Sequence, residues 1–92
     1  MIEVNQLETI AKKIRYLAVK LSYIGKAAHL GSSLSCVDLI TAAYWSFLNI
    51  DPNNPNHRSR DRFILSKGHA ITSLYAALAE KSFFSKDLLN TF

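Results

Sequence analysis

The chain has 92 residues, of which 49% are hydrophobic, with one cysteine and a formal net charge of +4 at pH 7. This length allows one small domain with a core, but it is short for a complete α/β enzyme with its own cofactor site. The basic residues lack the interleaved aromatic side chains of a nucleic-acid module, and no apolar run approaches the length of a membrane span. The lone Cys36 excludes an intrachain disulfide and a finger-type zinc site, and it favours a reducing cytoplasm.

The first expected element is an amphipathic helix over residues 6–24, where apolar side chains recur at helical spacing. Asn5 and Glu8 have the spacing of a capping pair, and Gly25 is well placed to end the helix. Charged side chains occupy the other faces, so one stripe of the helix is expected to meet a core.

Residues 26–34 are expected to form a loop, because histidine, glycine and serine interrupt the apolar periodicity there. Ser35 and Asp38 form a second capping signature. The helix that they predict, residues 36–48, is apolar on almost every side, and such a helix is normally buried all round. We therefore expect further protein to pack over it.

Residues 49–61 concentrate asparagine, proline and aspartate, which predicts an ordered surface connection. A short apolar strand suited to a buried parallel position is expected at 62–65, followed by a tight turn at 66–69. A third helix should then run from residue 71 to about residue 81, and Ser85 should cap a last helix over 86–92.

This order of elements predicts the opening of a larger α/β domain, mostly helical and with one parallel strand. A single strand leaves its backbone donors and acceptors unpaired, so other strands must complete a sheet. Residues 1–92 are accordingly expected to be an incomplete part of one domain.

Two histidines lie forty residues apart, His29 and His69, each beside a glycine in an expected turn. A strand, a turn with a basic residue and a helix form a geometry in which donors face an anionic group. Each of these donors also has a purely structural interpretation. His29 is then a loop histidine, His69 is a turn histidine that caps the following helix, and Lys67 is a solvent-facing or carboxylate-paired lysine. Ser32 and Ser33 are placed either to line a pocket or to cap their own backbone.

Three motifs carry a resemblance to the N-terminal segment of the transketolase family, which covers almost the whole chain. They are Ala-His-Leu-Gly at 28–31, Asp-Pro-Asn-Asn-Pro at 51–55, and Asp-Arg-Phe-Ile-Leu-Ser-Lys-Gly-His-Ala at 61–70. The family has Gly-His-x-Gly at the first of these, so Ala28 is a departure. The Ser-Lys-Gly-His block is the specific one.

The resemblance implies a three-layer α/β/α fold that binds thiamine diphosphate with Mg²⁺ or Ca²⁺. It implies transfer of a two-carbon ketol unit from a ketose phosphate to an aldose. Residue by residue, it implies a catalytic and substrate-binding role for His29, and a catalytic role against the cofactor diphosphate for His69. Ser32 and Lys67 are further candidates for cofactor binding.

The family binds its metal through a Gly-Asp-Gly stretch and a later asparagine, and this chain contains neither. We expect a truncated product or fragment that acts only within a homodimer or a complex with a downstream transketolase subunit. The alternative is a non-catalytic transketolase remnant that serves as a protein-interaction module. Neither alternative involves nucleic acid or a membrane.

Overall fold

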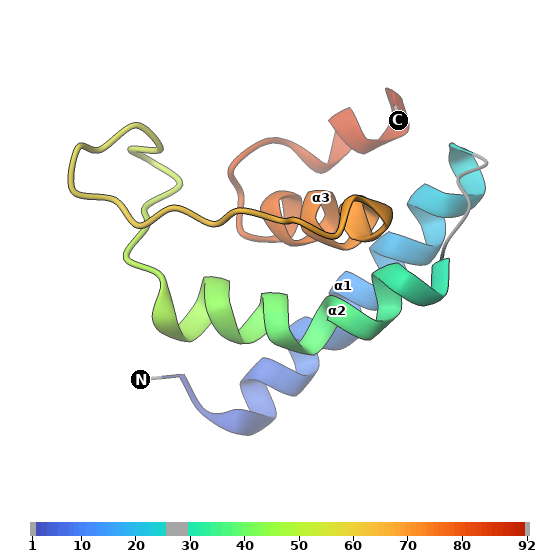
Figure 1. Ribbon diagram of the computed structural model, residues 1–92, viewed down its shortest axis with the longest axis horizontal. Helices are drawn as coiled ribbons and strands as arrows, with labels where there is room; N and C mark the ends of the chain where they lie inside the picture. Colours follow the sequence, from blue (N-terminus) through green and yellow to red (C-terminus); the bar gives the residue numbers. More distant parts are fainter. Residues whose placement is uncertain (1, 26–29, 92) are drawn as a thin grey trace.

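Regular structure in this molecule is entirely helical over the residues that the computed structural model describes, 2–25 and 30–91 (Figure 1). Three α-helices carry the fold: α1 (Val4–Ile24), α2 (Leu30–Ala42) and α3 (Ile71–Glu80). Each of them packs against the other two. None of the described helices combines the length and the hydropathy that crossing a membrane requires.

The expected α/β fold class, with one parallel strand at 62–65, is therefore wrong for the described residues. The segment is extended, but no described segment forms a backbone ladder with it. Phe63 and Leu65 are half-buried, whereas Ile64 is 86% exposed, so one face of the segment lies against the helices and the other faces outward. An apolar run predicts a strand only if a second strand lies beside it, and local sequence does not carry that information.

Helix α1 begins earlier than the capping pattern predicted. Glu3 is the capping residue, and its backbone N–H donates to Gln6 Oε1 at 3.0 Å, which is one half of a capping box. Asn5 is therefore inside the helix, and the expected cap at this residue is wrong. The predicted end is confirmed, because the Gly25 N–H donates to the carbonyl of Leu21 at 2.9 Å and the helix stops at Ile24.

Helix α2 begins at Leu30, inside the segment expected to be a loop, so the Ser35 cap is also wrong. The helix ends at Ala42 and continues as a π-helical turn, Ala43–Phe47, in which the Leu48 N–H donates to the Ala43 carbonyl at 2.8 Å. This wider turn directs Tyr44 into the interior. Its ring lies 5.4 Å from that of Phe63 and 6.4 Å from that of Phe83, measured between centroids.

Helix α3 confirms the third predicted helix and ends in a Schellman motif. The Phe83 N–H donates to the Leu78 carbonyl at 2.9 Å, and the Ser82 N–H donates to the Ala79 carbonyl at 3.0 Å. Ser82 has the left-handed φ of 71° that this motif requires. After it, Ser85 Oγ accepts from the Asp87 N–H, and the last helix, expected over 86–92, is a 3₁₀ helix, η3 (Lys86–Thr91).

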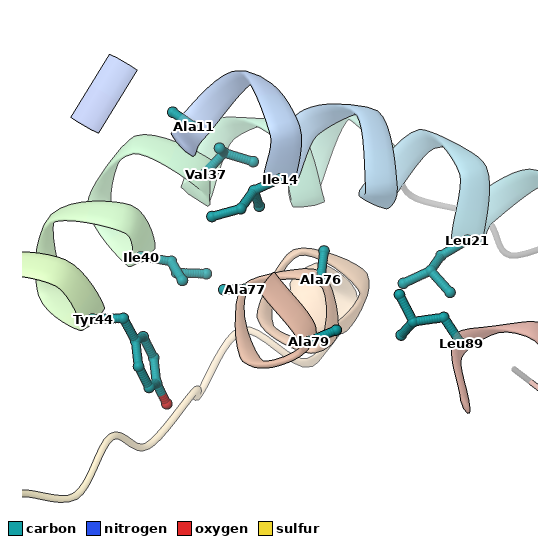
Figure 2. Close-up of a cluster of buried hydrophobic side chains, with 10 residues drawn as sticks. All are labelled: Ala11, Ile14, Leu21, Val37, Ile40, Tyr44, Ala76, Ala77, Ala79 and Leu89. Atoms are coloured by element: carbon teal, nitrogen blue, oxygen red, sulfur yellow. The ribbon is translucent and has the colours of Figure 1, made fainter. Parts of the chain in front are cut away.

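The core lies where the three helices meet, and small side chains on α3 make it possible. In Figure 2, Ile14 of α1 and Ile40 of α2 point toward the alanines of α3, and Leu21 points toward Leu89 of η3. Alanine side chains let the larger residues of α1 and α2 approach the α3 backbone closely, which keeps the interior well packed. The buried apolar cluster comprises Ala11, Ile14, Leu21, Val37, Ile40, Tyr44, Ala76, Ala77, Ala79 and Leu89.

The connection between the helical turn and the extended segment is ordered at its base, as predicted. The Asn49 N–H donates to Asp61 Oδ2 at 2.6 Å, and the Asp61 N–H donates to the Asn49 carbonyl at 2.9 Å. These two bonds bring the ends of the connection together, so the extended segment returns along the helices toward α3 (Figure 1).

Candidate functional site

The start of α2 meets the turn that precedes α3, and most of the predicted site residues lie at this meeting point. The turn contains a short 3₁₀ segment, η2 (Gly68–Ala70), which packs against α2. Lys67 Nζ donates to Ser35 Oγ at 2.9 Å, and Ser35 Oγ donates in turn to the Ser32 carbonyl at 2.9 Å. The ammonium group of Lys67 is thus attached to the first turns of α2.

Lys67 is exposed and has no carboxylate partner among the described residues. The carboxylate pair is not seen within the described part of the chain, so a solvent-facing lysine and a phosphate ligand are the two interpretations that this geometry allows. A cation held by a serine hydroxyl keeps its charge available to an anion, since a neutral hydroxyl does not offset that charge. Ser32 is half-buried and joins this hydrogen-bonded series through its backbone carbonyl, with Ser35 between it and the cation.

A buried hydroxyl pair holds the turn to α2 from beneath. Ser33 Oγ and Thr72 Oγ1 are hydrogen-bonded to each other, and Ser33 Oγ also donates to the His69 carbonyl at 3.4 Å. Ser33 and Thr72 are 1% and 3% exposed, and the neighbouring Ala70 is fully buried. The backbone around His69 is consequently anchored on its inner side, while His69 itself is exposed.

The two glycines of the site leave its backbone open. A Cβ added at Gly31 or at Gly68 would meet no other heavy atom within 4 Å. Neither glycine has a positive φ, so neither is required by backbone conformation. A missing Cβ leaves the main chain at both positions accessible from outside.

His29 lies outside the described residues, because residues 26–29 are not described. Its position along the chain is immediately before the first residue of α2. The structure therefore brings Ser32, Lys67 and His69 into one region and leaves the predicted role of His29 untested, together with the departure at Ala28.

The chemistry of the described donors suits an anion. An ammonium group, serine hydroxyls and an imidazole can each donate to phosphate oxygens. In residues 2–25 and 30–91, no three His, Cys, Asp or Glu side chains form a group that could hold a metal ion. The donor set present thus fits the diphosphate of the implied cofactor.

Sequence reasoning missed two residues of this region. Ser35 was expected to cap a helix, yet it is the partner of Lys67, and Thr72 had no predicted role. A signal for Thr72 and Ser33 was present in the sequence, because each is a small hydroxyl residue on a helix face that otherwise enters the core. No local pattern pointed to the contact between Ser35 and Lys67, which are 32 positions apart.

Comparisons with known proteins identify the family of this chain. Residues 6–88 match the family model described as "Transketolase, thiamine diphosphate binding domain". The chain is 38% identical over 89 residues to one subunit of the apulose-4-phosphate transketolase of Phocaeicola vulgatus, and 46% identical over 87 residues to 6-deoxy-6-sulfo-D-fructose transketolase subunit SqwG of a Clostridium species. It is also 39% identical over 70 residues to a transketolase of Aquifex aeolicus.

These alignments cover 97%, 92% and 76% of this chain, respectively. They cover only 32%, 31% and 10% of the relatives, so the chain spans about a third of the two subunits that it matches. The family match extends over more than half of the chain, and it includes the described residues of the α2 start and the 66–70 turn. The chain therefore belongs to the transketolase family and contains part of its thiamine diphosphate-binding domain.

Proposed function

We propose that this chain is the opening part of an enzyme that transfers a two-carbon ketol unit from a ketose phosphate to an aldose acceptor. The proposal depends mainly on one observation: Lys67 presents a cation without a carboxylate partner in the described residues, beside the first turns of α2 and next to His69. We expect the chain to act only together with the rest of the thiamine diphosphate-binding domain or with a partner subunit.

In this proposal, each residue acts on a charged or polar atom. Lys67 and Ser32 hold the cofactor diphosphate, with Lys67 neutralising charge and the backbone at Gly68 permitting close approach. His69 contacts the same diphosphate and exchanges a proton with a nearby substrate hydroxyl. His29, outside the described residues, donates to substrate oxygens. Thiamine diphosphate, when bound, supplies the carbon nucleophile and the electron sink, and Mg²⁺ or Ca²⁺ is held by ligands outside this chain.

Exposed apolar side chains support the proposal of a larger assembly. Leu39 is 71% exposed and Phe47 is 80% exposed, and both lie on the helix that the sequence predicted to be covered by further protein. Two of the relatives are themselves named as transketolase subunits. We propose a homodimer or a complex with a complementary subunit, in a reducing compartment such as the cytoplasm.

A chimera tests the proposal directly. The first 87 aligned residues of the Clostridium relative are replaced with those of this chain, and thiamine diphosphate binding is measured by calorimetry in the presence of Mg²⁺. A Kd within about tenfold of that of the parent protein supports the proposal, since each factor of ten corresponds to about 1.4 kcal/mol. A chimera with native circular dichroism and no affinity for the cofactor contradicts it and favours the non-catalytic remnant.

Two single variants of the chimera test the residues. Lys67→Gln should weaken cofactor binding about tenfold, because a charge-assisted bond to phosphate contributes roughly 1.5–3 kcal/mol before solvent screening. His69→Ala should weaken binding and lower the maximal rate. The matched control is His57→Ala, which changes an exposed histidine in the 49–61 connection. If all three variants bind alike, the assignment of the diphosphate site is wrong.

A further inference from the structure

A groove separate from the candidate cofactor site lies between α1 and η3. It has a volume of about 550 Å³, and its lining includes residues of α1 from Lys12 to Ile24 and residues of η3 and the end of α3. The floor is apolar, with Leu17, Leu21 and Leu89 below the opening. Leu21 and Leu89 point toward each other and close the base (Figure 2). None of the residues assigned to the cofactor lines this groove.

Three lysines on the α1 wall have no carboxylate partner in the described part of the chain: Lys12, Lys13 and Lys20. A fourth, Lys86 on η3, is paired with Glu80 at 2.9 Å, and Asp87 is the remaining acidic residue of the lining. The groove therefore has excess positive charge along one wall. An occupant with negative charge facing α1 would offset the repulsion among these lysines.

The spacing along α1 separates two of the three lysines from the apolar floor. Lys12, Tyr16 and Lys20 follow one another at four-residue intervals and form an outer row, while Lys13 begins the row beside it, which continues with Leu17 and Leu21. Tyr16 is 67% exposed, so an aromatic surface stands between two cations at the rim. A partner that bound here would bury apolar groups at the floor and keep its carboxylates at the rim.

The walls favour a helical occupant over an extended one. Helices α1 and η3 offer no free backbone edge with which an extended peptide could pair, whereas a helix satisfies its own backbone bonds. Residues 12–24 of α1 span roughly 18 Å at 1.5 Å per residue, which accommodates about three turns of a second helix.

We propose that this groove is a docking site for an acidic amphipathic helix of another polypeptide. Its carboxylates contact Lys12, Lys13 and Lys20, and its apolar face covers Leu17 and Leu21. This interaction does not depend on thiamine diphosphate, and it stands whether or not the chain takes part in ketol transfer.

The test uses the 92-residue chain and a fluorescein-labelled 16-residue peptide with leucines at i, i+3, i+4 and i+7 and glutamates on the opposite face. Fluorescence anisotropy should show binding that weakens as NaCl is raised from 50 to 500 mM, because exposed charges are screened over shorter distances. Lys13→Glu together with Lys20→Glu should weaken binding by about tenfold, since two attractive contacts become repulsive. Tyr16→Ala should weaken it by a smaller factor.

Two controls separate a groove from a merely basic surface. Arg58→Glu with Arg62→Glu makes the same change of net charge at exposed positions away from the groove and should leave the affinity unchanged. A peptide of the same composition without helical periodicity should bind at least about tenfold more weakly. Circular dichroism checks that each variant keeps its helices. If Lys13→Glu with Lys20→Glu loses helical signal, Lys13→Gln with Lys20→Gln is measured in its place. Equal loss in the arginine control, equal binding of the aperiodic peptide, or no binding at 100 μM peptide overturns the proposal.

Discussion

The hydroxyl pair beneath the candidate site is expected to stabilise the molecule only while both members are present. Ser33 and Thr72 are 1% and 3% exposed, so neither hydroxyl has water as an alternative partner. Ser33→Ala removes one partner and leaves the other hydroxyl buried without its bond, which costs roughly 1–3 kcal/mol. Thr72→Val preserves shape and should cost less than Ser33→Ala, because the Ser33 hydroxyl keeps its bond to the His69 carbonyl.

The double variant decides whether this reasoning is correct. Ser33→Ala with Thr72→Val removes both polar groups at once, so no orphaned hydroxyl remains, and the combined loss should be smaller than the sum of the single losses by about 1 kcal/mol or more. Urea unfolding of the four proteins, followed by far-ultraviolet circular dichroism and by Trp45 fluorescence, gives the free energies. Additive losses, or a loss below roughly 0.3 kcal/mol in each single variant, would refute the coupling.

Three further outcomes are expected. Ile14→Ala, at a fully buried position, should lower the free energy of unfolding by about 2–5 kcal/mol in thermal or urea melts, whereas Val19→Ala, 44% exposed, should change it by less than about 0.5 kcal/mol. Ser82→Gly should raise the free energy of unfolding by roughly 0.5–1 kcal/mol, because glycine adopts the left-handed φ without steric cost; a lower melting temperature would contradict this. Burial raises the pKa of Tyr44 above its ordinary value of 10, so the free energy of unfolding should fall as the pH rises from 10 through the raised folded-state pKa. Tyr44→Phe should remove that fall, and Tyr16→Phe should not.

Helices α1 and α3 could be predicted from sequence because their stability depends on a pattern contained within each segment. In α1, apolar residues recur at helical spacing over several turns, and the structure buries that stripe. In α3, the alanine-rich run after the Ser-Lys-Gly-His turn is both a good helix former and small enough to lie between the other helices. For both helices, local preference and tertiary packing agree.

The start of α2 could not be predicted, because there local preference and tertiary packing disagree. Serine and glycine are weak helix formers in a helix interior, so residues 26–34 were expected to form a loop and Ser35 to cap the next helix. In the structure, Ser33 is buried against Thr72, which is 39 positions away, and Ser35 binds Lys67. These contacts stabilise helix in a sequence that alone favours other conformations.

For the candidate site, the sequence indicates residue types and not their arrangement. The Ser-Lys-Gly-His block makes Lys67 and His69 candidates, and the structure adds that Lys67 is attached to α2 through Ser35, while the roles of both residues stay predictions. The expected strand at 62–65 failed for a different reason, because strand formation depends on a neighbouring segment, and none of the described residues provides one.

The π-helical turn Ala43–Phe47 limits how the length of this region can vary among related sequences. A π turn is equivalent to one residue inserted into an α-helix and takes up that residue locally, so deleting one residue there would restore α-helical bonding. The deletion would remove the wide turn that holds Tyr44 against Phe63 and Phe83, which come from two other segments. Insertions in the exposed connection, by contrast, leave the Asn49–Asp61 base intact and cost only about 0.6 kcal/mol for each doubling of loop length. Changes in chain length should therefore be tolerated at 52–60 and rejected at 43–47.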